Sequence, residues 1–226
     1  MSQSIFAVLT VGAGYLVYRF MRIPAILLDK NRDPSDNSRE IYWQRITTAI
    51  IYGGLPVLYL LTRDQNFKLS GINFCSTVEG LLYSLMIGII LFIINLLNHK
   101  QPDNLEAFPQ IRLPQWNKGT LVLSALTWIF YLFCYELLFR GFLLFTLDEV
   151  AGKWIAILIN TLLYMGVHLH KGWKEAAGAV PFGIILCLVC LRSGSFIPAF
   201  ISHIILALSA EWLSLKAHPA IRLKRN

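Results

Sequence analysis

The chain has 226 residues, of which 56% are hydrophobic and 15% are charged, and its mean hydropathy is +0.57. Soluble domains have roughly 45–50% apolar and about 25% charged residues, so the composition excludes a soluble domain and predicts a polytopic membrane protein. The net charge is +7, but the basic residues lie between apolar segments, where membrane topology explains them. We therefore exclude nucleic acid as a partner and expect the lipid bilayer instead.

Seven apolar segments, separated by polar loops, indicate membrane-spanning helices. They cover residues 5–20, 41–61, 78–97, 119–147, 154–168, 176–191 and 196–215. The sequence predicts an all-α fold, a bundle of about seven transmembrane helices. We divide it into N-terminal helices with a proline-containing surface loop (1–118), a membrane core (119–215) and a basic tail (216–226).

Basic residues are divided unevenly between the two sets of loops. The loops after the first, third and fifth segments, together with the C-terminal tail, carry fifteen Lys and Arg residues, Arg45 among them, and the other loops carry four. Because cytoplasmic loops collect Lys and Arg, the C-terminus is predicted to be cytoplasmic and the N-terminus outside. We expect a multi-pass protein of the bacterial plasma (inner) membrane.

Two charged residues interrupt the fourth apolar segment. Between Leu121 and Leu147 the only acidic or basic side chains are Glu136 and Arg140. Four residues make about one helical turn, so the two side chains share a face and can pair, which makes charge tolerable inside a bilayer. Such a pair either marks a functional site or pins helices together. The sequence favours the functional site.

Two histidines lie at comparable depths in other segments. At 1.5 Å per residue from the outer end of each helix, Glu136 is about 16 Å deep, His168 about 21 Å and His203 about 10 Å. We therefore expect these three residues to line one polar cavity between the fourth, fifth and seventh segments, with His170 and His218 outside it. One glutamate and two histidines suit a divalent metal such as Zn²⁺, or metal-free activation of water.

These residues belong to three short patterns in chain order. Glu136 and Arg140 are separated by three residues, Tyr164 precedes His168 by four positions, and His203 follows a Ser-Gly-Ser turn. The patterns resemble the motifs of the CAAX protease and bacteriocin-processing (CPBP, or Abi) intramembrane proteases, which include prenyl-protein endopeptidases. The resemblance covers roughly residues 119–215.

The resemblance implies a membrane-embedded hydrolase, an endopeptidase that cleaves a membrane-associated peptide or protein. Glu136 and His168 would activate the water, His203 would polarise the scissile carbonyl, and Arg140 would flank the glutamate. Alternatively, Glu136, His168 and His203 would all bind a metal, as in a metalloprotease.

Two positions depart from the motifs of the family. Tyr135 occupies the place of a first glutamate, and Ala207 occupies the place of an asparagine or aspartate. A phenol with an ordinary pKa near 10 is a poor base at neutral pH. A methyl group cannot donate a hydrogen bond to an oxyanion, a loss of about 10²–10³ in rate. Glu136 would therefore have to supply the base.

Three hypotheses follow from the sequence. The first is the intramembrane endopeptidase. The second is a catalytically degenerate relative that binds a hydrophobic peptide without cutting it, as in bacteriocin self-immunity. The third is a small transporter, for which we would expect breaks in paired spans, where Pro181 and Pro198 are available.

The uneven distribution of basic residues makes the topology testable. Reporter proteins fused within the loop at 98–118 and after Lys216 should both report the cytoplasm. A signal from the outer side of the membrane at either fusion would contradict seven spans with an outside N-terminus.

Overall fold

The computed structural model describes residues 2–20, 37–63, 67, 72–74 and 76–224. Most of the segment between the first two predicted spans lies outside the described residues. The same is true of five of the basic residues used to predict the topology, Arg22, Lys30, Arg32, Lys68 and Arg225.

The described chain is almost entirely helical, which confirms the predicted all-α fold. The helices are α1 (Gln3–Phe20), α3 (Ser38–Thr62), α4 (Val78–Asn98), α5 (Pro102–Ala107), α6 (Lys118–Glu136), α7 (Leu144–Ala151), α8 (Lys153–His168), α9 (Trp173–Ser193) and α10 (Ile197–Ala217). A π-helix, η1 (Leu137–Leu143), joins α6 to α7, and a 3-10 turn, η2 (Leu169–Lys171), follows α8. Two short strands, β1 (Gln115–Trp116) and β2 (Arg222–Leu223), pair in parallel.

All seven predicted segments are helical, and five helices in the described parts are long and apolar enough to cross a membrane. These are α3, α4, the continuous stretch from α6 to α7, α9 and α10. Helix α8 has 16 residues and, like α1, does not belong to this set. The protein is an integral membrane protein, and the count of seven crossings stays a prediction.

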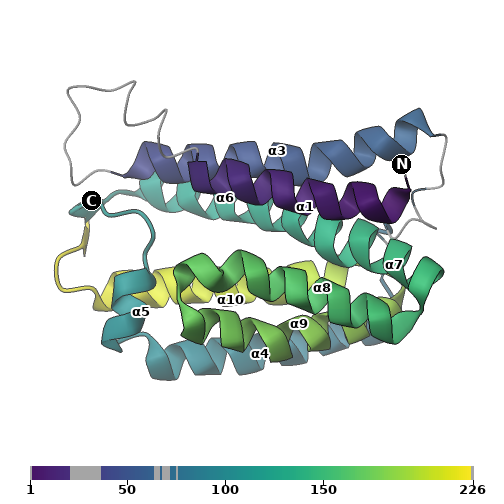
Figure 1. Ribbon diagram of the computed structural model, residues 1–226. Helices are drawn as coiled ribbons and strands as arrows, with labels where there is room; N and C mark the ends of the chain where they lie inside the picture. Colours follow the sequence, from purple (N-terminus) through teal and green to yellow (C-terminus); the bar gives the residue numbers. More distant parts are fainter. Residues whose placement is uncertain (1, 21–36, 64–66, 68–71, 75, 225–226) are drawn as a thin grey trace.

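The helices form two layers (Figure 1). Helix α3 packs against α1 and α6 in one layer, while α10 packs against α4, and α8 against α9, in the other. Contacts of α6 with α10 and of α7 with α8 join the layers. The N- and C-termini lie at opposite ends of the bundle, as an odd number of crossings requires.

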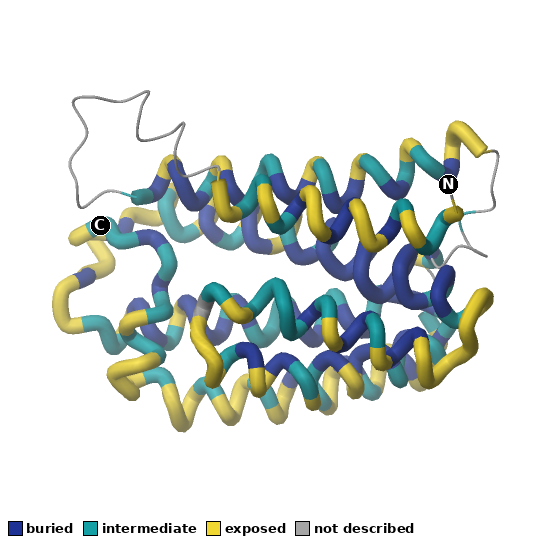
Figure 2. The backbone as a smooth tube through the Cα atoms, viewed as in Figure 1, coloured by how far each residue is buried: buried dark blue, intermediate teal, exposed yellow. Residues whose placement is uncertain are grey.

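Exposed residues lie on the outer faces of the bundle, and buried residues lie between the layers (Figure 2). Many of the exposed residues are large and apolar. On α4 the large apolar residues Val78, Leu82, Met86 and Leu97 are each more than half exposed. Contiguous apolar surface of this kind is rare on soluble monomers but is what lipid chains contact. The outer surface therefore agrees with a membrane location.

A buried ion pair that the sequence analysis missed links α3 to α10. Nη2 of Arg45 is 3.3 Å from Oε2 of Glu211, and both side chains are at most 2% exposed. Helix α6 completes the cluster: Arg45 donates to the carbonyl oxygen of Ser124 (3.1 Å) and to Oγ1 of Thr127 (3.2 Å). The carboxylate of Glu211 accepts from the hydroxyl of Ser124 and, at 2.8 Å, from Nε1 of Trp128.

The assignment of Arg45 to a cytoplasmic loop was wrong. The residue lies near the start of α3, where a basic side chain resembles one that flanks a span. Its partner is 166 positions away in the sequence, beyond the reach of any local pattern. Arg45 therefore gives no information about which side of the membrane its loop occupies.

Removal of one partner of this pair should destabilise the fold strongly. Glu211→Ala leaves the Arg45 charge buried, and we expect it to lower the free energy of unfolding by about 3–5 kcal/mol. Arg45→Met combined with Glu211→Leu removes both charges and should recover most of that loss. Thermal unfolding in detergent, followed by circular dichroism, measures both.

A matched control is the exposed pair of Arg192 and Glu79, whose side chains are 65% and 46% exposed. Arg192→Ala should change the unfolding temperature little, because water already solvates both charges. If the double variant at positions 45 and 211 were as unstable as Glu211→Ala, the buried charge would not be the cause of the loss.

Candidate active site

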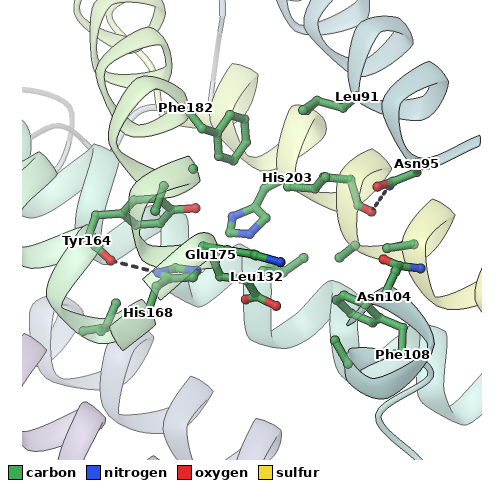
Figure 3. Close-up of a pocket in the computed structure, with 18 of the residues that line it drawn as sticks. Leu91, Asn95, Asn104, Phe108, Leu132, Tyr164, His168, Glu175, Phe182 and His203 are labelled. Atoms are coloured by element: carbon green, nitrogen blue, oxygen red, sulfur yellow. Dashed lines mark hydrogen bonds between the residues drawn. The ribbon is translucent and has the colours of Figure 1, made fainter. Parts of the chain in front are cut away.

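A cavity of about 790 Å³ lies between the two layers. The three predicted walls, α6, α8 and α10, are present, and residues of α1, α3, α4, α5 and α9 also line it. Figure 3 shows part of the lining, with Tyr164 and His168 on one side, Asn95 and Asn104 on the other, and His203 between them. The cavity is therefore wider than the three-helix site predicted from the sequence.

The helix that carries Glu136 changes its winding at that residue. Helix α6 ends at Glu136, and the next seven residues form η1, all of them buried. A π-helix is rare, and it is found mostly at functional sites. The carbonyl oxygen of Phe139 in η1 accepts a hydrogen bond of 2.6 Å from Nδ2 of Asn160 on α8. The irregular segment is thus tied to the neighbouring layer.

The predicted pairing of Glu136 with Arg140 is present. Nη1 of Arg140 is 3.3 Å from Oε2 of Glu136, and neither side chain has any exposed surface. The guanidinium of Arg140 also lies over the ring of Tyr164, 4.1 Å from its centroid, where the face of the aromatic ring attracts a cation.

Gly183 of α9 makes this close packing possible. A Cβ atom at this position would lie 3.2 Å from Cδ1 of Tyr164 and 3.5 Å from Nη2 of Arg140. A side chain at this position would therefore require the ring of Tyr164 to shift by a few tenths of an ångström.

The carboxylate of Glu136 reaches the cavity through His203. Oε1 of Glu136 is 2.6 Å from Nδ1 of His203, while Glu136 itself is not among the residues that line the cavity. An ionised carboxylate only accepts hydrogen bonds, so Nδ1 of His203 carries a hydrogen and donates it to Glu136, and Nε2 is the ring nitrogen left for other contacts. The prediction that Glu136 faces the cavity directly was wrong, because His203 of α10 lies in front of it.

His168 lies beside the same aromatic residue as His203. Its Nδ1 is 2.8 Å from the carbonyl oxygen of Tyr164, which can only accept, so this nitrogen also carries the hydrogen. The ring centroids of Tyr164 and His168 are 4.6 Å apart, and those of Tyr164 and His203 are 6.3 Å apart. Both imidazoles line the cavity, as predicted.

The two histidines predicted to lie outside the cavity differ in position. His170, predicted to lie outside the cavity, lines it, because η2 turns the chain so that its ring lies 5.9 Å from that of Tyr15 and 5.5 Å from that of Tyr18. His218 is not a lining residue, as expected, and its Nε2 is 3.0 Å from Nη1 of Arg112.

The two positions that depart from the sequence motifs both line the cavity. The ring of Tyr135 packs edge-on to His203 at 5.8 Å and stacks on Phe139 at 4.5 Å. Ala207 lies one helical turn after His203 on α10. A phenol and a methyl group therefore occupy the wall next to the imidazole.

The residues do not fit the predicted three-ligand zinc site. Within the described parts of the chain, no group of three or more His, Cys, Asp and Glu side chains is placed to hold a metal ion. One oxygen of Glu136 is hydrogen-bonded to His203, and the other faces Arg140. A cation at that carboxylate would meet a proton on one side and a guanidinium on the other.

An aromatic lining was not foreseen from the sequence. It includes Tyr15 and Tyr18 of α1, Tyr52 of α3, and Trp128 and Tyr131 of α6. The signal available was the recurrence of tyrosine inside segments that otherwise contain aliphatic residues. An apolar ligand with polar groups suits such a surface, because phenols offer both a ring face and a hydroxyl.

Comparison with known proteins adds one finding. Residues 117–209 match the family model Rce1-like, described as type II CAAX prenyl endopeptidase Rce1-like. The matched segment extends from the start of α6 into α10 and includes the Glu136–Arg140 pair, His168 and His203. It confirms the resemblance predicted from the motifs. No curated protein and no solved structure matches the chain.

Proposed function

We propose that the protein, whose residues 117–209 match the Rce1-like family model, is an intramembrane endopeptidase that cleaves a membrane-associated peptide or protein. The observation that carries this proposal is the 2.6 Å hydrogen bond from His203 to Glu136 at the wall of an internal cavity. A carboxylate that orients an imidazole toward a ligand site is a recurrent arrangement for general-base catalysis.

In the proposed reaction His203 is the base. Its Nε2 takes a proton from water as the water oxygen attacks the scissile carbonyl carbon. The same proton then passes to the amide nitrogen as the C–N bond breaks, which releases an amine and a carboxylic acid. Glu136 orients the ring of His203 and stabilises the imidazolium, while Arg140 pairs with the other oxygen of Glu136 and holds it in position. His168, held by its hydrogen bond to the carbonyl oxygen of Tyr164, is a second imidazole at the cavity, and we assign it to positioning the water.

These roles differ from those expected from the sequence. The resemblance to the family implies that Glu136 and His168 activate the water and that His203 polarises the scissile carbonyl. In the structure Glu136 has no surface toward the cavity, so it can act on water only through His203. The glutamate therefore becomes the group that positions the base.

The cavity favours a substrate that is delivered by the membrane. Its volume of about 790 Å³ is within the range of ligand sites, and much of its wall is aromatic or aliphatic. We propose a peptide bearing an apolar or prenyl group, consistent with the description of the matched family.

One observation favours a second candidate function. Tyr135 and Ala207 line the cavity at the positions where the family motifs have a carboxylate and a carboxamide. A protein that binds a hydrophobic peptide without cutting it, as in bacteriocin immunity, needs the cavity but neither of those groups.

Substitution of the site residues tests the enzyme. Glu136→Gln and His168→Ala should each lower the rate of cleavage by at least about 10²-fold, because each removes a group that orients the base or the water. Tyr135→Phe, a matched control that keeps the ring, should retain most activity. Cleavage of a farnesylated peptide in proteoliposomes measures the rate, and size-exclusion chromatography checks the fold.

Full biological function in both Glu136→Gln and His168→Ala would defeat the enzyme hypothesis and leave the peptide-binding one.

Restoring the family motifs separates the two functions further. Tyr135→Glu combined with Ala207→Asn supplies a carboxylate and a donor for the oxyanion, and one such donor is worth about 10²–10³ in rate. We expect cleavage of the same peptide to increase. Undetectable cleavage by both the unaltered protein and a correctly folded double variant would support the peptide-binding function.

A further inference from the structure

We propose that Asn95 and Asn104 form a subsite that binds the main chain of an extended peptide by accepting hydrogen bonds from its N–H groups. Both residues line the cavity. The inference rests on the proposed function only for the nature of the ligand, a peptide. The subsite itself follows from the hydrogen bonds that the two side chains already make.

The amide nitrogen of Asn95 has no donor capacity left. Its Nδ2 donates to the carbonyl oxygen of Leu206 at 2.9 Å and to Oγ of Ser209 at 2.7 Å, which uses both hydrogens. A main-chain carbonyl can only accept, so the orientation of the amide is fixed by this contact. The polar group that remains is Oδ1, and no described residue donates to it.

Asn104, which lies on α5, also uses both hydrogens of its amide nitrogen. Its Nδ2 donates to Oγ of Ser214 at 2.6 Å and to the carbonyl oxygen of His99 at 3.4 Å. Again both hydrogens are used, and none of the described side chains or amides donates to Oδ1. Two cavity-lining carboxamides are therefore held by α10 or the main chain in an orientation that leaves an acceptor.

Two other asparagines, Asn37 and Asn160, are satisfied at both the amide nitrogen and the carbonyl oxygen. Asn37 donates to a main-chain carbonyl, and its Oδ1 accepts from the amide of Arg112 at 2.7 Å. Asn160 donates to the carbonyl of Phe139, and its Oδ1 accepts from Sγ of Cys187 at 3.4 Å. These residues have structural roles outside the cavity, whereas Asn95 and Asn104 line it.

The position of the two carboxamides fits a peptide that also reaches the proposed reactive groups. In Figure 3 they lie across the cavity from Tyr164 and His168, with His203 between. An extended chain advances about 3.3 Å per residue and presents its N–H groups to alternate sides. A peptide that enters an apolar cavity loses water from these N–H groups, so acceptors on the wall are needed to replace it.

This subsite would recognise the backbone and be indifferent to side-chain identity. The test is a backbone N-methyl scan of a fluorescent peptide that ends in a farnesylated Cys-aliphatic-aliphatic-X sequence. Binding to the purified protein is measured by anisotropy. With unaltered protein, N-methylation should weaken binding roughly 2- to 10-fold, the range for one hydrogen bond, at particular alternate positions.

Asn95→Leu and Asn104→Leu should each abolish the penalty at one of these positions and leave the other. Asn117→Ser is the matched control. Asn117 caps α6 by accepting from the amide of Thr120 and does not line the cavity, and serine is also a good cap. It should show the same pattern as unaltered protein. The N-methyl scan on the unaltered protein tests the subsite even if a leucine variant fails to fold.

Several results would overturn the inference. These are uniform or absent penalties along the peptide, the same penalties in the leucine variants, binding of farnesylcysteine alone as tightly as the peptide, or no binding of the peptide. Failure of the proposed function looks different. A peptide that binds with the predicted pattern but is never cleaved would refute the endopeptidase and leave the subsite, and cleavage without the pattern would do the reverse.

Discussion

The carboxylate of Glu136 has no exposed surface, and contacts with neighbouring side chains offset the free energy lost on its desolvation. A charge inside a low-dielectric bundle is tolerated when it is paired and hydrogen-bonded. Arg140 supplies the opposite charge, and His203 supplies a hydrogen bond from another helix. The π-helical segment that begins after Glu136 is anchored through Asn160, and Gly183 leaves room for the guanidinium against Tyr164. Loss of any of these contacts would leave a buried charge with less support.

Helices α6 and α10 are joined by two polar links. One is the contact of Glu136 with His203, and the other is the cluster in which Ser124 and Trp128 of α6 bind Glu211 of α10. His203 and Glu211 are eight residues apart, about 12 Å along a helix. Between them Ala207 packs with Trp128 and Leu132. The two links hold the helices in register, and the small side chain at position 207 leaves the space that becomes part of the cavity.

The sequence predicted what local patterns can encode. Opposite charges four residues apart in an apolar run predicted the pair of Glu136 and Arg140, and depth along each helix brought His168 and His203 to one cavity. The rotation of each helix was not predictable, because these helices are apolar on most faces and their periodicity does not identify an inner side. For that reason the sequence could not show that His203 lies in front of Glu136. Arg45 was misplaced since its partner is distant in sequence.

The site lacks two polar groups of the family motif but keeps its buried ion pair and histidine. Tyr135 and Ala207 remove a carboxylate and a carboxamide from the wall of the cavity, yet the buried ion pair and its imidazole remain. A cavity that only bound an apolar peptide would not require them, because well-packed hydrophobic residues in place of a buried ion pair are often as stable or more so. An ion pair kept only for packing would not require an imidazole hydrogen-bonded to it at the wall of the cavity. The two features together support the proposed hydrolysis, in which His203 is the proposed base in place of a carboxylate.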